Sequence, residues 1–141
     1  MVLVSKLCRE VGLDQARLRC DHLNPSRSFK DRSASVGIAW ALEQGCPGVG
    51  CASSGNAAGA AATYAARAGL PAYIVVSSGA PKSKLSVPIA HGARAFRGRG
   101  DFSRAFTAAR EAALEVGLAN LTTCVNCYAW EGNKSVAYEL F

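Results

Sequence analysis

Alternating helical and strand-like segments, joined by short connections, constrain the fold of this chain more than any other feature of its sequence. The helical patterns fall at residues 5–12, 31–44, 56–68, 82–91, 102–116 and 133–141, and the strand-like runs at 17–23, 49–53, 73–76, 93–97 and 121–125. Successive β-α units favour a parallel sheet with right-handed connections and helices on both faces. From residue 31 onwards the sequence therefore predicts an α/β domain with three layers, α/β/α, around a mainly parallel four-stranded sheet.

Two prolines and a glycine predict how these helices end or break. Gly45 and Pro47 follow the helical pattern at 31–44 and are expected to terminate it. Pro88 lies inside the pattern at 82–91, where it is expected to kink the helix or limit it to two short turns.

The division of the chain follows from the same patterns. Residues 1–30 are expected to form an N-terminal arm of one helix and one strand that ends at Lys30. Residues 31–141 are expected to form the α/β domain, which stops inside its last helix.

Charge is concentrated in one segment of this basic chain. Residues 81–110 carry seven lysines and arginines against Asp101 alone. Such a cluster is compatible with a nucleic-acid face or with a field that attracts anionic substrates, but we favour a solvated helix and loop surface that attracts anions to some extent. Because no aromatic signature of RNA binding accompanies it, we expect no nucleic-acid partner. No apolar run approaches the ~20 residues of a membrane span, so we expect no membrane association and a cytoplasmic location.

Six cysteines raise the question of disulfides or a metal site. Cys51 and Cys124 fall in predicted buried strands, where a free cysteine acts as a small apolar residue. Cys124 and Cys127 have the C-x-x-C spacing, but no second pair lies at the distance of a zinc finger. We therefore expect reduced thiols and no metal.

A lysine motif precedes the helix at 31–44. The segment reads Asn-Pro-Ser-Arg-Ser-Phe-Lys-Asp-Arg over residues 24–32, with Lys30 directly after Phe29. Most lysines are solvated charges, but lysine is also the side chain that forms a Schiff base with a carbonyl cofactor in a dry site. Asp31 and Arg32 are expected to pair and hold the start of the helix.

A second motif lies between the strand at 49–53 and the helix at 56–68. Ser53, Ser54, Gly55, Asn56 and Ala57 occupy the helix N-terminus, where backbone N–H groups lack partners and favour an anion. The alternative is simple capping, with Ser54 or Asn56 as the N-cap residue.

Together the two motifs resemble those of fold-type II pyridoxal-phosphate enzymes, and within these the lysine segment is most similar to threonine synthase. The resemblance extends from about Leu3 to the C-terminus. It implies that the chain is the smaller N-terminal domain of such an enzyme, with pyridoxal 5'-phosphate as cofactor and a small amino-acid substrate. The implied roles are as follows: Lys30 is catalytic, Phe29, Lys30 and Asn56 bind cofactor, and Ser53, Ser54, Gly55, Asn56 and Ala57 bind substrate.

The resemblance also covers two later segments. Lys84 falls where the family has a lysine that can reach the substrate's phosphate, although a surface lysine is about as plausible. Residues 126–134 resemble a threonine synthase segment in which Asn126 binds substrate. Ala129, however, replaces the family's phosphate-binding arginine, and a guanidinium contributes strongly to phosphate recognition.

The resemblance implies a PLP-dependent lyase that converts O-phosphohomoserine and water to threonine and phosphate, as a homodimer in the intact enzyme. Ala129 keeps open a related β-replacement or elimination enzyme, such as cysteate synthase or threonine dehydratase. The family's glycine-rich phosphate loop does not occur after Asn56. We therefore expect an N-terminal fragment that is inactive alone, and a non-catalytic interaction module remains a further alternative.

Overall fold

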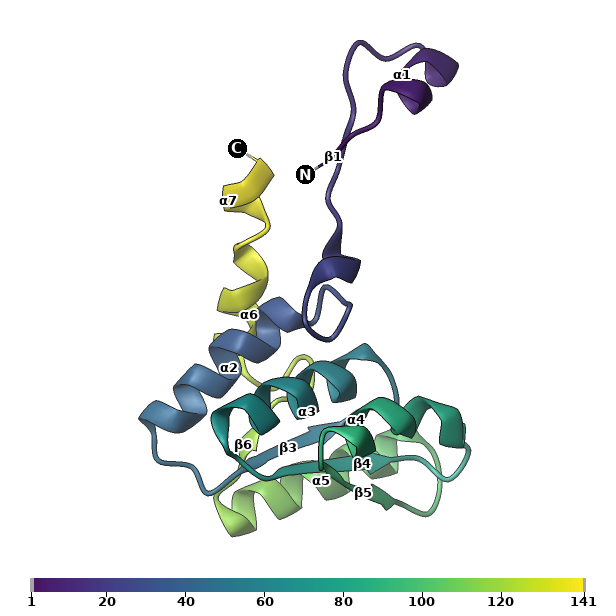
Figure 1. The fold of residues 1–141 in the computed structure, drawn as a ribbon. Helices are drawn as coiled ribbons and strands as arrows, with labels where there is room; N and C mark the ends of the chain where they lie inside the picture. The colour runs from purple at the N-terminus through teal and green to yellow at the C-terminus, as the bar shows by residue number, and fades with distance from the viewer. Residues whose placement is uncertain (1, 141) are drawn as a thin grey trace.

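A parallel sheet forms the centre of the protein in the computed structural model, which describes residues 2–140 (Figure 1). Its strands are β3 (Val49–Ala52), β4 (Ala72–Val76), β5 (Arg94–Arg97) and β6 (Ala119–Asn120), in the spatial order β5-β4-β3-β6. All three strand pairings are parallel. The predicted four-stranded parallel sheet is confirmed.

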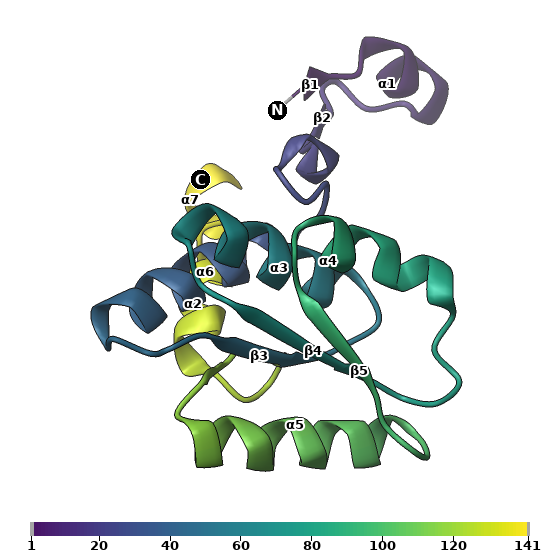
Figure 2. The same ribbon diagram turned by 60° about the horizontal axis from the view of Figure 1, so that its bottom comes forward.

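Helices cover both faces of this sheet. Figure 2 shows α2 (Asp31–Glu43), α3 (Asn56–Ala68) and α4 (Ser86–Ala90) on one side and α5 (Phe102–Val116) on the other. A 3₁₀ turn, η2 (Lys82–Leu85), precedes α4, and Pro88 lies within α4. The three-layer α/β/α architecture is confirmed, and so is the division of 82–91 into two short turns.

Small side chains let α3 lie close against the sheet. Ala58, Ala61, Ala62 and Ala65 are buried on α3, and they pack in one cluster with strand residues that include Ile74. Alanine combines the best helix propensity with a small side chain, so it allows close packing without straining the helix. The first turn of α3 is thereby fixed beside the end of β3.

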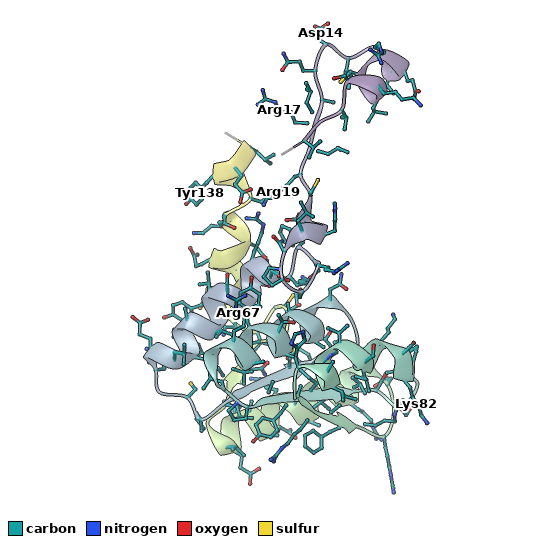
Figure 3. All side chains as sticks on the ribbon, viewed as in Figure 1. Asp14, Arg17, Arg19, Arg67, Lys82 and Tyr138 are labelled. Atoms are coloured by element: carbon teal, nitrogen blue, oxygen red, sulfur yellow. The ribbon has the colours of Figure 1, made fainter. Side chains whose placement is uncertain are left out.

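The arm extends away from the α/β domain. It contains β1 (Val2–Leu3), α1 (Ser5–Val11), β2 (Arg17–Leu18) and the 3₁₀ turn η1 (Asp21–Leu23), with β1 and β2 antiparallel. Figure 3 shows the labelled Asp14 at the far end of the arm from the domain that carries Lys82. The strand predicted at 17–23 is wrong beyond Leu18, because its only partner in the described chain is the two-residue β1.

Ion pairs join the base of the arm to the domain. Arg32 on α2 pairs with Asp21 of η1, at 3.6 Å, and with Glu139 of α7 (Ala137–Leu140), at 2.8 Å. Arg19 also pairs with Asp21 and Glu139. These contacts bring the segment before Lys30 into contact with the domain.

The C-terminal part differs from its prediction. The strand predicted at 121–125 is β6, at Ala119–Asn120, and the chain then leaves the sheet because Thr122 Oγ1 accepts a hydrogen bond from the backbone N–H of Ala52, at 2.8 Å. Cys124 is consequently exposed, with φ of 75°, and is not in a buried strand. The helix predicted at 133–141 is wrong in its start, because α6 (Cys127–Lys134) begins six residues earlier and α7 follows it as a separate helix. Residue 141 lies outside the described residues.

Among residues 2–140, no helix combines the length and apolarity that a membrane crossing requires.

Candidate active site

The lysine motif and the loop at residues 53–57 lie at the point in the sheet where the direction of strand order reverses. The chain passes from β3 to β4 and β5 in one direction, and α5 then carries it across the other face to β6, on the far side of β3 (Figure 2). In open α/β sheets, ligands bind beyond the carboxyl ends of the strands at such a turning point. Lys30, Ala57 and Leu121 line a common cavity there.

The backbone around Lys30 is held by a tight set of hydrogen bonds. Its N–H donates to Ser28 Oγ at 3.2 Å, and its carbonyl accepts from Ser33 Oγ at 2.9 Å and from the N–H of Ala34 at 2.9 Å. Ahead of it, the Asn24 side chain donates to the Ser28 carbonyl at 3.0 Å. These hydrogen bonds fix the backbone of Lys30, which is the residue directly before α2.

Asp31 and Arg32 hold the helix start separately. The buried Asp31 carboxylate accepts from the backbone N–H of Ser26 at 2.7 Å and from the Ser26 hydroxyl. Arg32 pairs with Asp21 and Glu139 instead. The expectation that Asp31 and Arg32 pair with each other is wrong, because the Pro-Ser turn presents its own donors to Asp31.

The cavity beside Lys30 is small and mostly apolar. It measures about 20 Å³, and its lining also includes Ser33, Ala34, Ala61, Thr123, Ala129, Trp130 and Asn133. Such a volume holds about one water molecule. Complete burial raises the pKa of the Cys51 thiol on β3 to about 12, while the positive charge of Lys30 lowers it. The charge of Lys30 therefore reaches the buried interior around Cys51.

A larger cavity of about 250 Å³ lies along the first turn of α3. Ser54, Gly55, Asn56 and Lys84 line it, together with Ser26, Gly59, Ser83, Val87 and Pro88. The N-cap residue of α3 is Gly55, and no side chain caps this helix. Capping by Ser54 or Asn56 is therefore wrong, and the first N–H groups are available to an anion.

The predicted site residues are only partly brought together. Lys30 and Ala57 line the small cavity, whereas Ser54, Gly55, Asn56 and Lys84 line the larger one. Ser53 Oγ accepts from the Gly55 N–H, at 3.1 Å, and so shapes the loop. The Phe29 ring lies 5.9 Å from the Arg32 guanidinium carbon and lines neither cavity.

Asn126 lies apart from these residues. Its Oδ1 accepts from the N–H groups of Tyr128 and Ala129, at 2.9 and 3.4 Å, and so caps α6. It lines a different groove, with Trp40 and Tyr128.

Asn133 is a site residue that the sequence reasoning missed. Its Oδ1 is buried and has no hydrogen-bond partner among residues 2–140, and the residue lines the cavity of Lys30. The available signal was its position one helical turn after Ala129, on the same face of a helix. That helix was predicted to begin at residue 133, so the relation could not be seen.

Lys30 brings an amine to a small, mostly apolar cavity beside the uncapped N-terminus of α3. An amine and free N–H groups are the functions needed to bind a carbonyl compound that carries an anionic group. The family model described as pyridoxal-phosphate dependent enzyme matches residues 1–141. The chain belongs to this family.

Curated relatives include threonine synthases. The one from Methanosarcina acetivorans is 33% identical over 136 residues, which cover 96% of this chain and 33% of that protein. The one from Synechocystis sp. is 38% identical over 136 residues, which cover 95% and 35%. The chain thus spans about a third of the length of these relatives.

A solved structure of maize serine racemase is also similar. It has a TM-score of 0.85 and 28% identity, and the match covers 98% of this chain and 43% of that one. The part of the chain described here is therefore arranged as in the corresponding part of a solved relative.

Lys30 has the amine that an aldehyde cofactor such as pyridoxal phosphate needs, and Asn56 has an amide that can bond a ring substituent. The two residues line different cavities. Within residues 2–140, no group of three or more histidine, cysteine, aspartate or glutamate side chains is arranged to hold a metal ion.

Proposed function

We propose that this chain is the lysine-bearing part of a lyase of the threonine synthase type, which converts O-phosphohomoserine and water to threonine and phosphate in the intact enzyme. The observation that carries the proposal is the juxtaposition of Lys30 with the uncapped start of α3, in a chain 33% and 38% identical to two threonine synthases. Because the chain spans only about a third of those relatives, its activity alone is expected to be absent.

Lys30 is assigned two roles. Its amine holds the cofactor covalently, and once released it moves protons at the Cα and Cβ atoms of the substrate. Pyridoxal phosphate, when bound, supplies the electron sink that makes those protons acidic. The nearby Cys51 does not compete as a base or nucleophile, because burial raises its pKa to about 12 and keeps it a neutral thiol.

The larger cavity is assigned to the substrate's anionic groups. The first N–H groups of α3 carry the positive end of the helix dipole, which suits a carboxylate. The side chain of Lys84 lines the same cavity and brings a full positive charge. Asn56 lines this larger cavity, next in sequence to Ala57 of the small cavity, and is assigned to the cofactor.

One observation favours a second candidate. Ala129 is 6% exposed and lines the cavity of Lys30, at the position where the threonine synthase segment carries a phosphate-binding arginine. An alanine there offers no charge to a leaving phosphate. The alternative is a related enzyme for a substrate without phosphate, such as a threonine dehydratase or a β-replacement enzyme. A non-catalytic module is the third candidate.

Product release distinguishes these candidates. Phosphate release from O-phosphohomoserine and ammonia release from threonine are measured in parallel on the protein and on Lys30→Ala. Lys30-dependent phosphate release supports the threonine synthase type, and Lys30-dependent ammonia release supports the dehydratase. If neither product depends on Lys30 in an enzyme with all its cofactor-binding parts, both catalytic assignments fail.

A further inference from the structure

Lys30 and Asn133 bring complementary polar groups to one small cavity. Asn133 Oδ1 is buried and accepts no hydrogen bond in the part of the chain that the structure describes. Within residues 2–140, the hydrogen bonds of Lys30 are made by its backbone, with Ser28, Ser33 and Ala34. The cavity that both residues line measures about 20 Å³.

This arrangement favours a hydrogen bond from the Lys30 amine to Asn133 Oδ1. A buried acceptor is rarely left unsatisfied in proteins, because it loses its hydrogen bonds to water without replacement. The lysine ammonium brings three donors and no acceptor, so it complements a carbonyl oxygen. The cavity holds about one water molecule, so the contact is either direct or bridged once.

The packing of α6 against α2 fixes the positions of Lys30 and Asn133 relative to each other. Gly132 lies so close to α2 that a Cβ atom there would collide with the carbonyl oxygen of Arg32. The next residue along α6 is Asn133, and Lys30 directly precedes α2. The two side chains are therefore carried by rigid elements in close contact.

We propose that Asn133 is a positioning residue whose Oδ1 holds the amine of Lys30, directly or through one water molecule. The contact is a property of this chain, and only its catalytic use rests on the proposed function. By holding the amine at the carboxyl end of the sheet, Asn133 keeps it within the small cavity beside the first turn of α3.

Among residues 2–140, Lys30 is the only charged residue that lines the cavity. Asp31 and Arg32 on α2, Cys51 on β3, Tyr64 on α3, and Glu131 and Lys134 on α6 belong to elements near it but do not line it. Asp31 is bound by Ser26, and Glu131 pairs with Lys134 on the exposed side of α6. Burial, followed by the charge of Asp31, raises the pKa of Tyr64. The buried Asn133 oxygen is left as the acceptor without a partner.

Reductive methylation with formaldehyde and cyanoborohydride tests the contact without any cofactor. The full chain is labelled between about pH 6 and pH 10, the range in which lysine labelling changes most. Peptide mass spectrometry compares Lys30 with the exposed Lys82, which serves as the internal reference. Four proteins are compared: the native chain, Asn133→Asp, Asn133→Leu and Asn133→Gln.

Opposite shifts are expected for the two disruptive variants. In Asn133→Asp, a carboxylate stabilises the ammonium form, so Lys30 methylation near neutral pH slows by about tenfold and its pH profile moves upward. In Asn133→Leu the acceptor is lost, so the profile moves downward. Asn133→Gln retains an amide oxygen and is expected to follow the native profile.

A purely structural role for Asn133 would not produce this pattern. Circular dichroism checks each fold, and Asn133→Ala, a truncation that also removes the acceptor, replaces Asn133→Leu if the latter does not fold. If the aspartate and acceptor-free variants shift Lys30 in the same direction, or leave its profile unchanged relative to Lys82, the contact does not exist. Because formaldehyde labels the amine directly, this result is independent of whether pyridoxal phosphate binds.

Discussion

Lys30 and Asn56 line two different cavities, although they stand at the starts of neighbouring helices. The reason is the rotation of α3. Ala57 and Ala61 are one turn apart and face the cavity of Lys30, whereas Asn56 and Gly59 face the cavity of Lys84. The family resemblance assigns both residues to one cofactor, which would therefore have to reach both cavities.

The first turn of α3 therefore forms the boundary between an amine pocket and an anion pocket. A ligand that used both would have to lie across this turn, with its carbonyl toward Lys30 and its acidic group toward the free N–H groups. An amino-acid substrate joined to an aldehyde cofactor has this division of chemistry.

We predict that pyridoxal phosphate reacts with Lys30 and not with an exposed lysine. Titration of the chain with pyridoxal phosphate is expected to give a weak, saturable absorbance band at ~410–430 nm, as for a lysine-bound cofactor. Lys30→Ala is expected to abolish the band, and Lys82→Ala, on an exposed lysine outside both cavities, is expected to retain it. A band that survives Lys30→Ala would show that the cofactor reacts elsewhere.

Gly132→Ala is expected to destabilise the protein. Helix propensity alone favours alanine by roughly 1 kcal/mol, but the added Cβ would collide with the backbone of Arg32. Forcing two helices apart costs typically ~1–3 kcal/mol or more. We therefore expect a net loss of stability in thermal or urea unfolding.

Gly79→Ala is the matched control, because Gly79 has open space around its Cβ position and no positive φ. Its stability is expected to change by less than about 0.5 kcal/mol. Equal effects of the two substitutions would mean that α6 does not pack against α2 as described.

Much of the fold could be predicted from the sequence, since glycine and proline define its boundaries. The helix at Asn56–Ala68 and the helix at Phe102–Val116 have the predicted bounds. The end of the sheet could not be predicted, because Leu121, Cys124 and Val125 are typical of a buried strand, whereas Thr122 makes a side-chain hydrogen bond with the backbone of Ala52. Only the three-dimensional structure shows where the last strand, β6, ends.

The candidate site was predictable as a pair of motifs but not as a set of contacts. Lys30 and the loop at 53–57 were identified from residue chemistry at a strand-to-helix turn. The role of Asn133 depends on how α6 lies against α2, which no local pattern encodes. Asn126 was expected to bind substrate, and the structure shows its side chain capping α6; no observation tests whether it also binds substrate.

The buried Cys51 predicts a pH dependence of stability. Its pKa is raised from 9.0 to about 12, chiefly by burial, so its neutral form is favoured in the folded state. The stabilisation is full below about pH 9, where both states hold the proton, and it falls as pH rises toward about 12. The expected slope is about 1.4 kcal/mol per pH unit in that window.

Comparing the native protein with Cys51→Ala isolates this contribution. Truncation changes packing by a constant amount at every pH, whereas loss of the thiol removes the slope. Urea unfolding between about pH 8 and pH 11 is therefore expected to show curves that converge as pH rises. Parallel curves would mean that the thiol of Cys51 ionises normally in the folded protein.

Ala129 lines the cavity of Lys30, and we predict that replacing it with arginine improves the use of a phosphorylated substrate. Charge-assisted hydrogen bonds from an arginine contribute about 1.5–3 kcal/mol each. Without them, the intact enzyme is expected to have a KM for O-phosphohomoserine about ten- to a hundredfold above that of Ala129→Arg, or to prefer a substrate without phosphate. Phosphate release measured on both proteins tests this.

The control must separate charge from volume, because Ala129 is buried and packs near Gly37. Ala129→Met adds a long uncharged side chain at the same position, so it tests filling of the cavity alone. We expect Met to leave the KM for O-phosphohomoserine unchanged or raise it, while Arg lowers it. If the two variants act alike, or if the native enzyme is already efficient and Arg changes nothing, another residue such as Lys84 holds the phosphate, and the cavity wall at Ala129 does not determine substrate choice.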